Sequence, residues 1–256
     1  MEGLGYIALV TMGITLGLVG AGGSILTIPI LVYLFNIPII LATSYSLVVV
    51  GSTALMGLLR YRHQILFKKA IVFLIPSVLG VFAARHFVIS ALPHNIGPLS
   101  IDKALVILLL IFMSIAGGFM IKKFPLHPQN HLPKTQNNRV ILVGLSLGIV
   151  MGILGAGGGF LIIPTLVLLM GFSMQDAVPS SLLIITVNSL IGFVADQHHF
   201  ITSDWWNLAE YLLPALLGML IGFYIAKFAN GENLKKAFGY FLWVVGIVIL
   251  MNEFIL

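Results

Sequence analysis

The chain has 256 residues, of which 59% are hydrophobic and 8% are charged, and it contains no cysteine. Because soluble domains carry about 25% charged residues, this composition excludes an ordinary soluble domain and predicts a membrane protein. The absence of cysteine excludes disulfides and thiolate metal sites. The net charge of +5 implies no nucleic-acid partner, since the lysines and arginines lie in short segments between apolar runs, as membrane topology requires.

Six apolar segments are close to the length of about 20 helical residues that crosses a hydrocarbon core ~30 Å thick. They lie at 39–59, 70–90, 104–121, 177–195, 208–228 and 236–254. A further apolar run, Leu4 to Phe35, is interrupted by the glycine-rich stretch GAGG. The chain start lacks the positive region of a secretory signal, so we expect this run to remain in the mature protein.

The glycine-rich stretch occurs twice. Residues 16–65 align without a gap on residues 151–200, so that Gly20-Ala21-Gly22-Gly23 falls on Gly155-Ala156-Gly157-Gly158. After a shift of three residues, PSVLG at 76–80 matches PALLG at 214–218. We therefore divide the chain into a first transmembrane repeat, 1–121, a polar cytoplasmic linker, 122–138, and a second transmembrane repeat, 139–256, because the proline, asparagine and glutamine content of the middle segment is typical of a loop.

The charge distribution indicates how the repeats are oriented. If each glycine-interrupted run enters and returns as a hairpin, each repeat crosses an odd number of times and the two are inverted. One membrane face then carries eleven lysines and arginines, and the other carries two, Arg85 and Lys103. If each run crosses once, the repeats are parallel and the same residues divide eight to five. The positive-inside rule favours the inverted arrangement, with both chain termini outside, although parity does not separate a re-entrant hairpin from two short full crossings.

The paired interruptions predict a ligand site. Non-helical backbone at membrane depth is tolerated only where protein or a water-filled cavity satisfies it, and interrupted helices at matching places in inverted repeats point to a transporter's binding site. The amides that open the following helix favour an anion. Close helix packing is the alternative role for such glycines. The candidate substrate-binding residues are Gly20, Gly22, Gly23, Ser24, Gly155, Gly157, Gly158, Gly159, Ser46, Ser181 and Asn188.

Charged residues inside the predicted spans are scarce. No acidic residue lies in the middle of a span, which argues against an intramembrane carboxylate relay. We expect Arg85 to extend its side chain to the membrane interface and Asp196 to lie in a solvated loop at the end of a span. Ser173 and Asp176 have the spacing of a capping box at the start of a span.

The two motifs also resemble those of a known family. GAGGSILTIP, from Gly20 to Pro29, and GAGGGFLIIP, from Gly155 to Pro164, in a short, duplicated, cysteine-free membrane protein resemble the sulfite exporter TauE/SafE family of permeases. The resemblance implies movement of a small sulfur-containing or organic anion, such as sulfite, a sulfonate or sulfoacetate, across the inner membrane. Ser24 stands where the second motif has Gly159, so the two half-sites are expected to contribute unequally.

We therefore predict an all-α polytopic membrane protein with two inverted repeats, each with a glycine-broken helix and three spanning helices. We expect it to be a multi-pass secondary transporter of a small anion in the inner membrane, with no cofactor. A passive channel or a non-transporting assembly factor is the alternative. An enzyme is disfavoured, because there is no His-Glu-x-x-His motif, no cysteine and no Gly-x-Ser-x-Gly turn. The sequence leaves a homo-oligomer and coupling to protons or sodium ions open.

Overall fold

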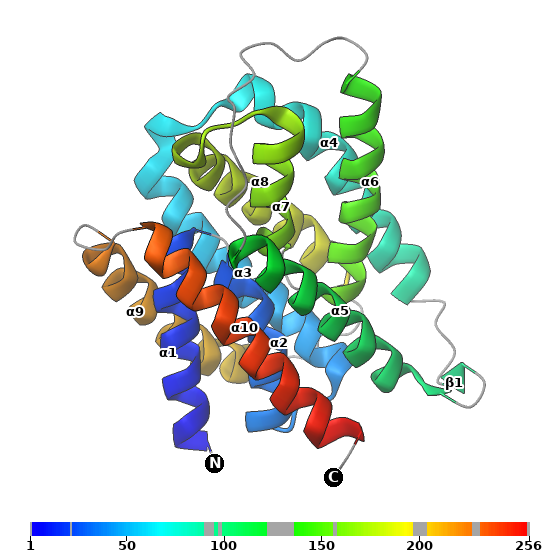
Figure 1. Cartoon of the computed structure of the whole chain (residues 1–256). Coiled ribbons are helices and arrows are strands. Elements are labelled where there is room, and N and C mark those ends of the chain that lie inside the picture. Colours follow the sequence, from blue (N-terminus) through cyan, green and yellow to red (C-terminus); the bar gives the residue numbers. More distant parts are fainter. Residues whose placement is uncertain are drawn as a thin grey trace.

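The computed structural model describes residues 2–20, 22–89, 95–96, 99–121, 136–155, 158–196, 204–226 and 231–254 (Figure 1). Apart from a short hairpin of β1 (Asn95–Ile96) and β2 (Leu99–Ser100), these residues form helices and the turns that join them. The α-helices are α1 (Glu2–Val19), α2 (Thr27–Pro29), α3 (Ile39–Tyr61), α4 (Phe67–Ala83), α5 (Ile101–Ile121), α6 (Gln136–Leu154), α7 (Gly159–Met170), α8 (Met174–Ala195), α9 (Asp204–Ile225) and α10 (Gly231–Phe254). Four short helical turns complete the fold: η1 (Gly22–Leu26), η2 (Ile30–Leu34), η3 (Arg62–Gln64) and η4 (Ala84–Ile89).

Several helices have the length and composition of membrane spans. In the described part of the chain, four helical segments are long and apolar enough to cross a membrane: Ile39–Gln64, Phe67–Phe87, Gln175–Ala195 and Trp205–Ile225. Shorter apolar helices cover Gly3–Leu18, Gly23–Leu34, Lys103–Ile115, Asn138–Leu154 and Leu242–Met251. The prediction of an all-helical membrane protein is therefore confirmed at this level. The orientation of the repeats stays a prediction.

The first apolar run is folded back on itself. Helix α1 ends at Val19, and Gly20 has a φ of 85°, a left-handed conformation that glycine adopts without strain. The segment formed by η1, α2 and η2 then returns along α1. At its start, a Cβ added to Gly23 would lie 2.5 Å from the Met12 carbonyl oxygen. At its end, the Phe35 ring packs on Tyr6, with ring centroids 5.2 Å apart.

The glycine-interrupted run of the second repeat begins with α6. Helix α6 starts at Gln136, so the last three residues of the predicted linker, 136–138, are helical. The rest of that linker lies outside the described residues. Helix α6 ends at Leu154, where Gly155 has a φ of 66°, and α7 follows after Gly158, which has a φ of 68°. Ser173 then caps α8 by accepting a hydrogen bond from the Asp176 amide at 3.2 Å, which confirms the N-terminal cap of the predicted capping box.

Equivalent helices of the two repeats lie antiparallel at the centre of the molecule. In α3 and α8, Gly51 faces Ser189, and Gly57 faces Leu182, so the numbering of the two helices runs in opposite directions. Helices α5 and α10 are also antiparallel, because Gly117 faces Trp243 and Leu110 faces Gly246. The Trp243 indole donates to the Ser114 carbonyl at 3.2 Å. Helix α1 begins, and α10 ends, at the lower edge of Figure 1.

The remaining long helices pack through glycines in two matching pairs. Between α1 and α9, a Cβ added to Gly13 would lie 2.1 Å from the Ala215 carbonyl oxygen. Between α6 and α4, a Cβ added to Gly148 would lie 2.2 Å from the Ser77 carbonyl oxygen. Gly148 is the repeat equivalent of Gly13, and Ser77 is that of Ala215. The two repeats thus make the same close backbone contact with each other twice, through small residues, as membrane helices do.

Candidate functional site

The glycine turn of the second repeat lies against a buried arginine. A Cβ added to Gly155 would lie 2.4 Å from Nη2 of Arg85 and 2.4 Å from the Thr43 carbonyl oxygen. No side chain fits in that space, and the positive φ of Gly155 also favours glycine. The turn that follows α6 therefore presents bare backbone to a guanidinium and to the first turns of α3.

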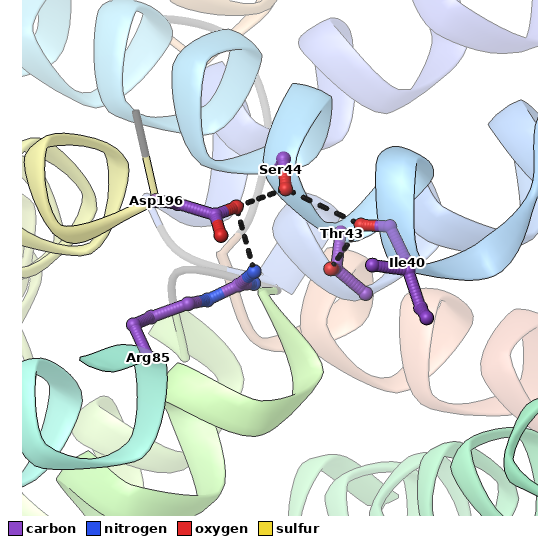
Figure 2. A network of polar contacts seen from close by, with 5 residues as sticks. All are labelled: Ile40, Thr43, Ser44, Arg85 and Asp196. Atoms are coloured by element: carbon purple, nitrogen blue, oxygen red, sulfur yellow. Dashed lines mark hydrogen bonds and ion pairs between the residues drawn. The ribbon is translucent and has the colours of Figure 1, made fainter. Parts of the chain in front are cut away.

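Arg85 belongs to a buried polar cluster that joins three helices (Figure 2). Its Nη1 donates to Oδ2 of Asp196 at 3.1 Å, and the two side chains are 0% and 2% exposed. The Ser44 hydroxyl, on α3, donates to the same Asp196 oxygen. Ser44 and Thr43 also donate to the Ile40 carbonyl oxygen, at 3.3 Å and 2.7 Å, so α3 holds both hydroxyls in place. Asp196 Oδ2 thus accepts hydrogen bonds from a guanidinium and a hydroxyl, both of which belong to the first repeat.

Local structure explains why these two charges meet. Arg85 lies in the π-helical turn η4, which continues α4, and Asp196 is the C-terminal capping residue of α8. Helix α8 packs between α3 and α4, so the end of α8 brings its carboxylate between Ser44 and Arg85. Charge inside a membrane protein is costly, is usually paired, and commonly marks a substrate or ion pathway. The Arg85–Asp196 pair is consequently a candidate functional feature.

The glycine turn of the first repeat occupies the equivalent place with different chemistry. A Cβ added to Gly20 would lie 2.2 Å from Cγ1 of Val178, and Val178 is the repeat equivalent of Thr43. The residues equivalent to Arg85 and Asp196 are Phe223 and Tyr61, whose rings meet edge to face with centroids 5.9 Å apart. The two turns thus share an architecture, with an ion pair beside one and an aromatic pair beside the other.

The two glycine turns are separate in space. Gly20 contacts Val178 near the start of α8, whereas Gly155 contacts Thr43, whose neighbour Ser44 bonds to Asp196 at the end of α8. Eighteen residues separate Val178 from Asp196, which corresponds to roughly 27 Å of helix at 1.5 Å per residue. A small anion therefore contacts one turn at a time.

The other predicted site residues have several roles. Gly23 packs on α1, and Gly158 packs on Met151. Ser181 donates to the Val178 carbonyl of its own helix at 2.8 Å. Asn188 accepts from the Ser77 hydroxyl at 3.2 Å, and so links α8 to α4. Of the remaining candidates, Ser24, Ser46 and Gly159 are buried, and Gly22 is the first residue of η1. Gly157 lies outside the described residues.

The two charged residues of the cluster do not lie where the sequence predicts them. We expected Arg85 to extend to the membrane interface and Asp196 to lie in a solvated loop, and both expectations are wrong, because both side chains are buried. A sequence signal was present. In the repeat alignment, each charged residue falls opposite an aromatic one, Tyr61 or Phe223, and the two charges have opposite signs.

A concave surface elsewhere in the molecule suits a different kind of contact. An open groove between α5 and α10 is lined by Ile107, Leu110, Ile111, Ser114 and Leu250. Its hydroxyl, Ser114, donates to the Leu110 carbonyl of its own helix. The lining is otherwise apolar and fits hydrocarbon better than an anion, so the polar cluster at Arg85 remains the candidate site.

Comparison with known proteins defines the class of this fold and site. A probable membrane transporter protein of Xylella fastidiosa is 28% identical over 251 residues, which cover 94% of this chain and 92% of that protein. A probable membrane transporter protein of Bacillus subtilis is 28% identical over 226 residues, covering 86% of each. No solved structure matches the chain. The fold and these relatives define a helical membrane transporter.

The family model for the sulfite exporter TauE/SafE matches residues 6–249, nearly the whole chain. The chain belongs to this family, and the predicted resemblance is confirmed.

Proposed function

We propose that the protein is a secondary transporter that moves a small sulfur-containing or organic anion, such as sulfite or a sulfonate, across the inner membrane. The observation that carries the proposal is the turn at Gly155. There, bare backbone lies against the buried Arg85 guanidinium, and the hydroxyls of Thr43 and Ser44 lie on the adjoining helix. Guanidinium and hydroxyl donors are groups that bind oxyanions.

Contacts between equivalent helices support an inverted arrangement of the repeats, and with it this mechanism. Helices α3 and α8 are antiparallel, and the α1–α9 contact is repeated between α6 and α4. Two inverted units of this kind exchange conformations when the path opens to one side and then to the other. The two glycine turns, at opposite ends of α8, are then equivalent parts of the two half-paths.

The distribution of basic residues orients the molecule in this proposal. Arg60, Arg62, Lys68 and Lys69 lie at the end of α3 and the start of α4. The positive-inside rule places this end in the cytoplasm, so the ends of α4 and α8 that carry Arg85 and Asp196 face outside. The start of α1 and the end of α10 then face outside as well.

Topology is tested by single-cysteine labelling, since the chain has no cysteine of its own. Gln64, between α3 and α4, and Asn207, near the start of α9, are both exposed. In whole cells, a membrane-impermeant thiol reagent should label Asn207→Cys and should reach Gln64→Cys only after the membrane is permeabilised. Labelling of Gln64→Cys from outside would overturn the orientation.

Transport is tested with purified protein in liposomes. Binding of a panel of sulfite, sulfonates and carboxylates first identifies a ligand, and uptake of that radiolabelled ligand then tests flux. A secondary transporter accelerates exchange of labelled ligand against unlabelled ligand inside, and gives transient accumulation by counterflow. A channel gives flux without counterflow, and an assembly factor gives no flux, so either result would contradict the proposal.

A further inference from the structure

We propose that Arg85 binds the transported anion directly and that the Asp196 carboxylate competes with the anion for this guanidinium. The inference rests on the proposed function and names the residues that recognise its substrate. It assigns to the ion pair a role in ligand exchange rather than in holding helices together.

The repeat equivalents of the pair argue against a purely structural role. At the other end of α8, Tyr61 and Phe223 join the equivalent helices, α3 and α9, through an edge-to-face ring contact. The fold therefore closes this position with uncharged side chains in one repeat. Replacing a buried ion pair by apolar side chains is often neutral or stabilising, so packing alone gives no reason for a buried guanidinium and carboxylate in the other repeat.

The geometry of the cluster matches an oxyanion. Arg85 Nη1 and the Ser44 hydroxyl converge on one oxygen, Oδ2 of Asp196. An oxygen of sulfite or of a sulfonate has the same charge character and can accept from both donors. In the other repeat, the position of Ser44 is occupied by Pro179 and that of Arg85 by Phe223, which provide neither donor. The recognition of an anion is thus confined to one of the two equivalent places.

Asp196 stands at the end of α8, and the Gly155 backbone lies in close contact with the guanidinium that Asp196 holds. Gly155 approaches Nη2 so closely that a Cβ there would lie 2.4 Å away. Asp196 follows the last residue of α8, Ala195, as its cap, with a φ of −104° and a ψ of 4°. A residue at the end of a helix can move without unwinding the helix, so Asp196 can leave Arg85 while Ser44 and Arg85 keep their places on α3 and the continuation of α4.

Binding of radiolabelled sulfite to purified protein, with methanesulfonate as competitor, tests the proposal in four variants. Asp196→Asn removes the competing charge and should lower the Kd for sulfite about tenfold relative to the parent. Arg85→Gln should abolish binding. Because each single change alters a buried pair, the double variant Arg85→Gln/Asp196→Asn removes both charges together and should melt within a few degrees of the parent, yet bind no sulfite. Phe223→Leu, at the equivalent place in the other repeat, should change the Kd less than about twofold.

The outcomes distinguish a failure of the proposed role of Arg85 from a failure of the proposed transport function. If the pair were only structural, the double variant would regain parental binding, and that result would overturn the role of Arg85. An unchanged or weaker affinity in Asp196→Asn would overturn competition. If the parent protein itself binds neither sulfite nor methanesulfonate nor any other anion of the panel, the proposed function fails, whatever the variants do.

Discussion

Close helix packing at glycines gives a quantitative test of the fold. Gly13→Ala places a Cβ 2.1 Å from the Ala215 carbonyl oxygen, and Gly148→Ala places one 2.2 Å from the Ser77 carbonyl oxygen. Contacts this short force the helices apart. Overpacking of this kind costs about 1–3 kcal/mol, while replacing glycine by alanine in a helix gains about 1 kcal/mol. We expect a net loss of up to about 2 kcal/mol at both positions.

Gly246 provides the matched control. It lies inside α10, and a Cβ added there would meet only Leu110 Cδ2, at 3.9 Å, which is ordinary van der Waals contact. Gly246→Ala therefore keeps the gain in helix propensity without a clash, and should raise the melting temperature slightly.

The measurement is thermal unfolding of each purified variant. With a shift of about 2–4 °C per kcal/mol for a chain of this size, Gly13→Ala and Gly148→Ala should each lower the melting temperature by up to roughly 8 °C. Since the two positions are repeat equivalents, the two shifts should agree. Equal melting temperatures for Gly148→Ala and Gly246→Ala would refute the packing role, and a large effect at only one of the two equivalent glycines would refute the repeated contact.

Three further changes probe single interactions. Ser173→Ala removes the cap of α8 and should cost about 1 kcal/mol of unfolding free energy, whereas Ser114→Ala, whose hydroxyl bonds its own helix, should cost less in the same melting assay. Asn188→Leu breaks the bond to the Ser77 hydroxyl and should cost about 1–3 kcal/mol; a double-mutant cycle with Ser77→Ala that shows no coupling would contradict this bond. Gly155→Ala forces a strained φ beside Arg85 and should reduce sulfite flux more than Gly246→Ala does, and parental flux would show that the turn is dispensable.

Much of the fold was predictable because it depends on length and local pattern. The predicted segment 39–59 corresponds to α3, and 177–195 to α8, since a run of apolar residues of this length has few other solutions. The cap at Ser173 depends on residues three positions apart and was equally visible. The gap-free repeat alignment identified the glycine stretches, and both contain glycines with positive φ.

The charged cluster could not be placed by the same reasoning. Arg85 and Asp196 are 111 residues apart in the chain, so no local pattern joins them. A basic residue near the end of a span is compatible with the interface, and a carboxylate after the last turn of a helix is compatible with a loop. Only the packing of α8 between α3 and α4 makes both side chains buried neighbours. The same packing also separates the two glycine turns, which sequence alone suggested as one site.

Competition at Arg85 has an electrostatic consequence for coupling. While Asp196 holds the guanidinium, the buried pair is neutral overall. Once an anion takes its place, the Asp196 carboxylate is left without this cation in surroundings where a lone charge is costly. Under the proposed competition, we expect a proton or a sodium ion to bind at Asp196 and offset that cost, which would link movement of the anion to movement of a cation.

This linkage predicts a specific defect in Asp196→Asn. The neutral amide needs no compensating cation, because the anion and Arg85 already balance each other. Exchange of labelled sulfite across a liposome membrane should therefore continue, since exchange needs only binding and the conformational change. Accumulation of sulfite driven by an imposed proton or sodium gradient should disappear in the variant, while the parent accumulates sulfite with one of the two gradients. Accumulation by Asp196→Asn equal to that of the parent would show that the driving cation binds elsewhere, and that Asp196 only shares Arg85 with the anion.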